Sequence, residues 1–352
     1  MPGPWRSPSP RQHIFIQKIL FINKEEISSH TVEDLHSLNL NRWRGWWCSA
    51  GMRSLYIHHD GIVYRGTCQV GDALGSIYNE GIDGLEELYT WIKCDKDVCA
   101  CGTDMQSPKV KSYDDISVVT PKKIKNLDFD GLTTVDLVKD PTMTFSGVFK
   151  DYKLVIWELG RRCNYDCWYC FPDSHNNYEG HKTLGSLKHG LGNLSRFWGA
   201  NQKMKFVFTG GEPTFNPDFL DFVTHLHDDL FHIIHTTTNG SHTPAYYAKL
   251  MQVSDIGFSA HLSYLERPEI YKKFISNIKS ANESKQSNHN ASLNWMGVRI
   301  MLQPGKLELA KTLYADCKEI TSNITIDLLH GKNKQILPYS QEEIAWIGSM
   351  GN

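Results

Sequence analysis

The sequence has no long uninterrupted apolar run. The best candidate, residues 14–22, is broken by Gln17 and Lys18 and has no small-residue cleavage site after it, so it predicts neither a signal peptide nor a membrane span. An excess of one charge is also missing. The 352 residues carry a net charge of −2 and have a pI near 6.8, which gives no electrostatic reason to expect a nucleic acid or an anionic membrane as partner. We therefore expect a soluble cytoplasmic protein.

Cysteine, in contrast, is plentiful. There are nine cysteines, and eight of them fall into two clusters. In a chain without a secretory signal, clustered cysteines indicate metal binding rather than disulfides. The first cluster consists of Cys48, Cys68, Cys94, Cys99 and Cys101, and the second of Cys163, Cys167 and Cys170. The ninth, Cys317, falls on the apolar face of an expected helix, so we interpret it as a core thiol.

The second cluster is the stretch around which the chain is organised. Its cysteines are spaced by three and then two residues, directly after the apolar run 154–157. Three thiolates on one loop can hold three irons of a cubane iron–sulfur cluster and leave the fourth iron without a protein ligand. Open coordination positions distinguish catalytic metal sites from closed structural ones. The alternatives are a structural zinc site and three thiols that merely share a loop.

The spacing Cys-x3-Cys-x-aromatic-Cys, with Tyr169 in the aromatic position, resembles the signature loop of the radical S-adenosylmethionine (radical SAM) enzymes. The resemblance implies that Cys163, Cys167 and Cys170 hold a 4Fe–4S cluster whose open iron is chelated by SAM. It also implies that an electron donor such as flavodoxin or ferredoxin drives cleavage of SAM to methionine and a 5′-deoxyadenosyl radical. That radical abstracts hydrogen from a substrate.

From residue 152 onward, six apolar strand-like segments alternate with amphipathic helical segments, which predicts a parallel sheet covered by helices. The expected strands are 153–158, 204–209, 232–237, 255–260, 297–302 and 323–329, and the expected helices are 182–197, 217–230, 244–253, 268–281, 307–320 and 340–349. Asn216-Pro217 and Thr243-Pro244 each indicate a helix start. Six units are too few for a closed eight-stranded barrel, and the resemblance implies a partial (β/α)6 TIM-like barrel over residues 151–352.

Polar residues and glycines follow the expected strands, and sites in parallel α/β barrels form at the carboxyl ends of strands. Gly210, Gly211 and Glu212 come after the second strand. Two glycines allow the backbone to approach a ligand closely, and a carboxylate accepts hydrogen bonds from an ammonium group. The resemblance implies that this Gly-Gly-Glu segment holds the amino group of SAM. The alternative is an ordinary turn that leads into a helix.

The third and fourth strands end in further candidates. The resemblance implies that Thr238 and Asn239 lie close to the cofactor and that Ser259 contacts SAM, although Asn239-Gly240 also fits an ordinary turn. Other pocket candidates share only their position near a strand end or the cysteine loop: Arg161, Asp166, Trp168, Asp173, Ser174, His175, His261, Gln303 and His330.

Residues 46–105 hold the first cysteine cluster. Short alternating segments at 55–57 and 62–64, joined through Asp60-Gly61, predict a β-hairpin, and a helix is expected over 84–91. The block resembles the SPASM or twitch extension of radical SAM enzymes, which carries auxiliary iron–sulfur clusters. That extension usually follows the catalytic domain, and its full pattern has seven cysteines.

With five cysteines, we expect a small α+β domain that holds one auxiliary cluster of the 4Fe–4S type. One cysteine is then spare, and a structural zinc site is the alternative. His58-His59, in the expected hairpin, is predicted to be exposed rather than ligating.

The expected organisation is therefore a partly disordered segment over 1–45, the auxiliary domain over 46–105, a connector over 106–150 and the partial barrel over 151–352. Thr31 and Asp34 resemble a capping box, which predicts a short helix in the first segment. We expect a radical SAM oxidoreductase that binds SAM and modifies a peptide or protein. The alternatives are a small-molecule or nucleotide substrate, an activase for a partner enzyme and a non-enzymatic zinc-binding scaffold.

Overall fold

The structure is a computed structural model, and it describes residues 19–23, 26–79, 81–82, 90–118, 143–145, 152–170, 175–287, 294–329, 331 and 336–350. The chain divides into two compact units, one of residues 1–156 with 189–204 and one of residues 157–188 with 205–352. Most of the helix expected over 84–91, much of the connector, and the candidates Asp173, Ser174 and His330 lie outside the described residues. No helix in the described part has the length and apolar content required to cross a membrane.

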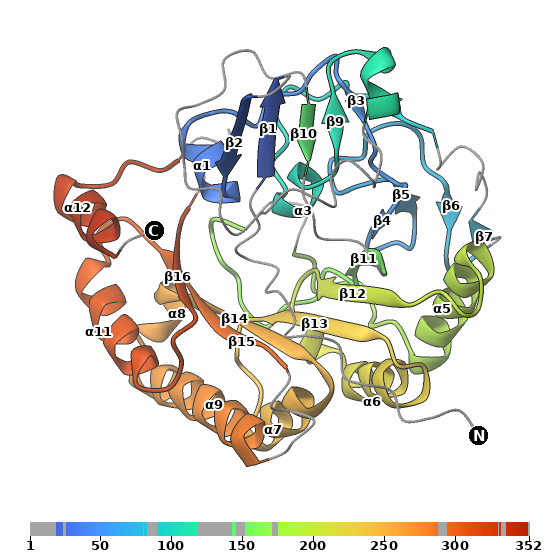
Figure 1. Ribbon diagram of the computed structural model, residues 1–352. Coiled ribbons are helices and arrows are strands. Elements are labelled where there is room, and N and C mark those ends of the chain that lie inside the picture. Colours follow the sequence, from blue (N-terminus) through green and yellow to red (C-terminus); the bar gives the residue numbers. More distant parts are fainter. Residues whose placement is uncertain are drawn as a thin grey trace. The chain divides into compact units, whose positions relative to one another are not determined.

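The first unit contains a six-stranded antiparallel sheet in the order β2-β1-β10-β9-β3-β8, of which Figure 1 labels β2, β1, β10, β9 and β3. Its strands are β1 (Ile19–Asn23), β2 (Glu26–His30), β3 (Trp47–Cys48), β8 (Ile92–Lys93), β9 (Lys109–Val110) and β10 (Met143–Phe145). Helix α1 (Val32–Ser37) begins with the predicted capping box, in which Thr31 and Asp34 exchange hydrogen bonds. The unit also has the short helix α3 (Gly102–Met105) and the 3₁₀ segment η1 (Tyr113–Val118).

The predicted hairpin is confirmed in this unit. Strands β4 (Ser54–Ile57) and β5 (Val63–Tyr64) pair in antiparallel orientation, with Ile57 opposite Val63. A second two-stranded pair, β6 (Gly75–Ser76) with β7 (Gly81–Ile82), follows. The hairpin thus lies between Cys48 and Cys68 in the chain, as the sequence predicts.

The second unit contains a mixed α/β fold with a parallel sheet, which the alternating pattern predicts. Its parallel strands are β12 (Met204–Thr209), β13 (Ile233–Thr238), β14 (Asp255–His261), β15 (Met296–Leu302) and β16 (Ile324–Leu328). The helices are α6 (Phe219–Thr224), α7 (Pro244–Val253), α8 (Leu262–Leu265), α9 (Pro268–Ser287), α11 (Leu307–Lys318) and α12 (Gln341–Ser349). Helices α7, α9 and α11 lie along the outer side of this sheet (Figure 1). Strand β11 (Lys153–Glu158) and helix α5 (Leu184–Trp198) each contain a boundary between the two units.

One helix start differs from the sequence pattern. Thr243 caps α7 as predicted, with Pro244 in the first turn. Asn216, however, does not cap α6. Pro213 begins a separate 3₁₀ turn, η2 (Pro213–Phe215), and the side chain of Asn216 accepts a hydrogen bond from the backbone of Asp218, so the helix begins only at Phe219.

The core of the second unit is rich in aromatic rings. Trp157 at the end of β11 packs against Phe206 of β12 and Phe222 of α6, with ring centroids 6.2 and 5.6 Å apart. Burial of each such side chain contributes roughly 1.5–3 kcal/mol. These contacts hold the end of β11 against β12 and α6, and the cysteine loop follows directly from that strand end.

Candidate functional site

The cysteine loop and the Gly-Gly-Glu segment lie against each other. The backbone N–H of Gly211 donates to the carbonyl of Gly160, and that of Glu212 donates to the carbonyl of Arg162, both at 2.8 Å. A Cβ atom on Gly211 would lie 2.2 Å from the carbonyl oxygen of Arg162, and one on Gly210 would lie 2.5 Å from that of Gly160. Both glycines are therefore required for the contact between the two segments, a reason that the sequence alone did not supply.

The three cysteines of the loop are free thiols. Cys163 and Cys167 are half-buried, whereas Cys170 is exposed. Burial raises the pKa of Cys163 to about 12 and that of Cys167 to about 11. Sγ of Cys163 accepts a hydrogen bond from the backbone N–H of Tyr165 at 3.3 Å.

An aromatic pair supports the loop from the end of β14. The hydroxyl of Tyr169 lies 2.7 Å from Nδ1 of His261, and the two rings stack with centroids 5.8 Å apart. The same Nδ1 lies 3.5 Å from Sγ of Cys167. Tyr165 stacks on Tyr264 with centroids 3.9 Å apart. The conformation of the cysteine loop is thus fixed by residues of β14 and α8 as well as by its own backbone.

Glu212 is the central acidic residue of the site, and it is 4% exposed. Its Oε1 accepts hydrogen bonds from the backbone N–H and hydroxyl of Thr214 and from the hydroxyl of Thr238, at 3.0, 2.6 and 2.7 Å. Its Oε2 accepts one, from the backbone N–H of Asn239 at 2.6 Å. Burial raises the pKa of Glu212 and outweighs the opposing effect of these hydrogen bonds.

The Thr-Asn-Gly turn after β13 is held from two sides. The amide of Asn239 donates to Oδ1 of Asn164, within the cysteine loop, at 2.9 Å. Asn277 of α9, which is fully buried, donates to the carbonyls of Gly240 and His242 at 2.7 and 2.9 Å. Gly240 has a φ of +71°, and a Cβ atom there would lie 2.7 Å from the ring of Phe274. The turn is thus fastened to the loop that carries the cysteines.

These segments enclose one cavity of about 240 Å³. All ten residues that the sequence assigned to the cluster and cofactor at this end of the chain line it: Cys163, Cys167, Tyr169, Cys170, Gly210, Gly211, Glu212, Thr238, Asn239 and Ser259. The pocket candidates His175 and His261 also line it, whereas Arg161, Asp166, Trp168 and Gln303 do not. Tyr165, Thr209 and Thr237 were not singled out from the sequence. The sequence could have indicated these three residues only through their position next to the candidate residues in the same segments.

One lining residue has a polar atom that a ligand would satisfy. Nε2 of His175 is buried and has no hydrogen-bond partner in the part of the chain that the structure describes. Its Nδ1 lies 3.4 Å from Oδ1 of Asp166. Because buried polar atoms are normally hydrogen-bonded, a polar ligand in the cavity would supply the missing hydrogen-bond partner of Nε2.

The cysteines of the first unit surround two buried charges. In the β3–β9 ladder Cys48 lies opposite Lys109, which is 1% exposed. The ammonium group of Lys109 donates to the carbonyls of Asp104, Met105 and Ser107 and lies 4.4 Å from the ring centroid of Trp43. Residues opposite each other on a ladder have side chains on the same face of the sheet. The buried positive charge of Lys109 therefore lies on the same face of the sheet as the thiol of Cys48.

Asp104 is the second buried charge beside these cysteines, and it is 3% exposed. Its Oδ2 accepts hydrogen bonds from the hydroxyl of Thr67 and the backbone N–H of Cys68, at 2.5 and 2.9 Å. Asp104 lies in α3, whose N-cap is Cys101. Cys99 is fixed by Asn41, which donates to its carbonyl and accepts from its backbone N–H. Burial raises the pKa of the thiols of Cys48, Cys99 and Cys101.

Comparison with known proteins finds a domain match that includes the residues of the candidate site. Residues 157–306 match the Radical SAM superfamily, so the chain carries a radical SAM domain over these residues, as the cysteine loop predicts. The chain is also similar to a GTP 3′,8-cyclase of Photorhabdus laumondii subsp. laumondii, with 31% identity over 105 residues. That similarity covers 30% of this chain and 31% of the cyclase, so the chain matches about a third of the length of this relative.

Solved structures overlap with the chain only in part. Streptococcus suis SuiB bound to precursor peptide SuiA has 12% identity and a TM-score of 0.42, with 68% of this chain and 57% of that chain covered. The structure of anSMEcpe with bound AdoMet has 20% identity and a TM-score of 0.35, with 50% and 51% covered.

Proposed function

We propose that this chain is a radical SAM enzyme that binds a 4Fe–4S cluster and SAM in the cavity of its second unit and abstracts hydrogen from a substrate. The supporting observation is that the cysteine loop, the Gly-Gly-Glu segment and the Thr-Asn-Gly turn line one cavity. All three segments also lie within the matched superfamily domain. The fold that accompanies this proposal is a partial (β/α)6 barrel formed by β11 to β16, with the site at the carboxyl ends of its strands.

The cysteine loop has the donor set that such a cluster needs. Cys163, Cys167 and Cys170 would each hold one iron through a thiolate, and the fourth iron would be open to SAM. When bound and reduced, the cluster supplies the electron that splits SAM into methionine and a 5′-deoxyadenosyl radical. The chain's own contribution is to hold the loop in place, through Tyr169 with His261 and through Asn239 with Asn164.

Glu212 fits the amino group of SAM. Oε1 already accepts three hydrogen bonds and Oε2 only one, so Oε2 has a lone pair available for an ammonium group. Gly210, Gly211, Thr238 and Ser259 would line the rest of the cofactor site. The unsatisfied Nε2 of His175 is a second atom toward which polar groups of the cofactor or substrate would be oriented.

We propose one auxiliary iron–sulfur cluster, of the 4Fe–4S type, on the five cysteines of the first unit. The buried ammonium of Lys109, on the same face of the sheet as Cys48, supports this assignment because it would offset part of the negative charge of a thiolate-bound cluster. This cluster would conduct electrons or orient the substrate.

The substrate is proposed to be a peptide or protein, because the five-cysteine block resembles an extension of radical SAM enzymes that modify such substrates. A nucleotide or another small molecule is the second candidate, and the similarity to a GTP 3′,8-cyclase favours it for the matched segment. An external one-electron donor, such as flavodoxin or ferredoxin, would be the redox partner in either case.

Iron content after anaerobic reconstitution tests the assignment of the two sites. Two 4Fe–4S clusters would give about eight irons per chain. Replacement of Cys163, Cys167 and Cys170 by Ala is expected to remove half of this iron and all SAM cleavage. Cys317→Ala is the matched control, because that thiol is buried in α11 and should leave the iron content unchanged. Loss of all iron in the triple variant, or zinc at both sites of the wild-type protein, would overturn the assignment.

A further inference from the structure

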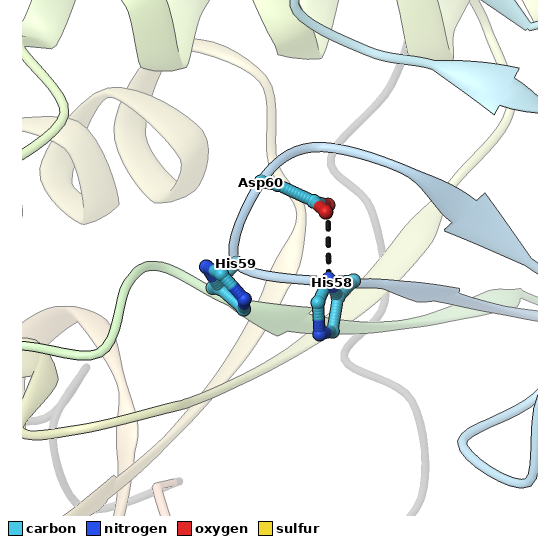
Figure 2. Close-up of side chains that lie close together, drawn as sticks. All are labelled: His58, His59 and Asp60. Carbon is cyan, nitrogen blue, oxygen red and sulfur yellow. Dashed lines mark ion pairs between the residues drawn. The ribbon is translucent and has the colours of Figure 1, made fainter. Parts of the chain in front are cut away.

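We propose that His58, His59 and Asp60 form a binding site for one divalent transition-metal ion, separate from the cysteine clusters. The three residues are consecutive and occupy the turn of the β4–β5 hairpin (Figure 2). Each offers one donor atom, and the three donors lie within 4.8 Å of one another. The inference does not depend on the radical SAM activity, because no cysteine and no residue of the cavity takes part.

The contact between His58 and Asp60 has the spacing of two ligands on one ion. Nδ1 of His58 lies 2.9 Å from Oδ1 of Asp60, and the two side chains point toward each other (Figure 2). Without an ion, the same two atoms form the ion pair that is dashed in Figure 2. Nitrogen and oxygen ligands at about 2.0–2.2 Å from a zinc ion, separated by 90–110°, are roughly 2.9–3.4 Å apart. The pair is therefore already at the spacing that a shared ion imposes.

The turn is rigid enough to hold these donors. The backbone N–H of His58 donates to the carbonyl of Ile62 at 2.9 Å, and that of Gly61 donates to the carbonyl of His58 at 2.8 Å. Oδ1 of Asp60 also accepts from the backbone N–H of Ile62 at 2.9 Å. Gly61 has a φ of +92°, and the ring of Tyr78 covers it. Binding an ion would therefore order only side chains.

Burial and ligand type indicate the class of ion. His59 is 9% exposed, contrary to the prediction that His58 and His59 are exposed. The ring centroids of the two histidines lie 4.0 Å apart. The side chain of Asp60 is 40% exposed, so solvent can supply the remaining ligands. Two imidazoles and one carboxylate suit Zn²⁺, Co²⁺ or Ni²⁺ better than Mg²⁺ or Ca²⁺, which prefer oxygen ligands.

Cobalt(II) titration of the anaerobic, reconstituted full-length protein tests this site. We expect one Co²⁺ per chain whose absorption lacks the thiolate-to-metal charge-transfer band that cysteine ligands produce. Asp60→Asn should weaken this binding at least 10-fold. The asparagine of this variant retains a side-chain oxygen that can accept from the backbone N–H of Ile62. The unfolding midpoint of the variant without metal should therefore match that of the wild type. His58→Gln should have the same effect on binding.

The matched control is His225→Gln. His225 also lies beside a carboxylate, that of Asp229 at 2.5 Å, but these two are not part of a three-donor group in the described chain. Its replacement should leave Co²⁺ binding unchanged. The proposal is overturned if Co²⁺ binds only with thiolate bands, if it does not bind, or if Asp60→Asn and His58→Gln bind it as tightly as the wild-type protein.

Discussion

Replacement of Gly211 by Ala is expected to destabilise the second unit and to open its candidate site. The added Cβ would lie 2.2 Å from the carbonyl oxygen of Arg162, whereas ordinary contacts begin at 3.4 Å. The two segments must therefore separate by roughly 1 Å. Such a shift breaks the hydrogen bonds from Gly211 to Gly160 and from Glu212 to Arg162, both now 2.8 Å long.

The expected loss of stability combines the cost of the broken hydrogen bonds with the cost of overpacking. Two hydrogen bonds contribute about 1 kcal/mol each, and overpacking of a filled space costs about 1–3 kcal/mol. We therefore expect the free energy of unfolding to fall by about 3–5 kcal/mol, a large part of the 5–15 kcal/mol typical of a domain.

Urea unfolding followed by tryptophan fluorescence measures this change, since Trp157 is buried in the same unit. Gly192→Ala in α5 is the control: nothing lies within 4 Å of its added Cβ, so it should stabilise the protein by about 0.5–1 kcal/mol. If Gly211→Ala unfolds at the urea concentration of the wild type, the cysteine loop and the Gly-Gly-Glu segment do not touch as described.

Three further predictions concern buried polar groups. Asn277→Ala should cost about 2–4 kcal/mol, because it leaves the carbonyls of Gly240 and His242 unsatisfied; a thermal melt unchanged from the wild type would contradict this. Burial lowers the pKa of His235 to about 3, below its unfolded value of about 6.5. The unfolded chain therefore takes up the proton first, and this residue should remove about 2 kcal/mol of stability between pH 7 and pH 5. His235→Asn should reduce that loss in urea titrations at the two pH values, and an equal loss in both proteins would refute it. Glu212→Gln should weaken SAM binding by about 30-fold or more, because it removes a buried charge partner worth 2–5 kcal/mol; calorimetry on the reconstituted protein would show this. Glu343→Gln, at another buried glutamate that caps α12, should bind SAM normally, and equal affinities in both variants would exclude the role of Glu212.

Local patterns in the sequence predicted most of the second unit. Helix α7 begins at Pro244 because both signals are local: the side chain of Thr243 accepts a hydrogen bond from the backbone N–H of Tyr246, and Pro244 occupies the first turn. The predicted start of α6 was wrong by two residues, because Asn216 is the C-cap of the preceding 3₁₀ turn η2 and not the N-cap of the helix. The strands were predicted closely, since buried parallel strands are continuous apolar runs whose limits are visible in the sequence.

Contacts between distant segments could not be predicted. The sequence marks Gly210 and Gly211 as permissive, but not that the carbonyls of Gly160 and Arg162 occupy the space beside them. It likewise shows Cys48 and Lys109 as separate residues, and only the ladder between β3 and β9 places them opposite each other. The burial of His59 has the same origin, because it depends on what packs against the hairpin.

Formation of 5′-deoxyadenosine is the most direct readout of the proposed radical SAM activity. The anaerobically reconstituted protein would be reduced in the presence of SAM, and the products separated by chromatography, beside a Cys170→Ala variant treated identically. We expect 5′-deoxyadenosine and methionine from the wild-type protein and only background amounts from the variant. A wild-type protein that takes up about eight irons, is reduced and binds SAM, yet forms no more 5′-deoxyadenosine than Cys170→Ala, would contradict this expectation.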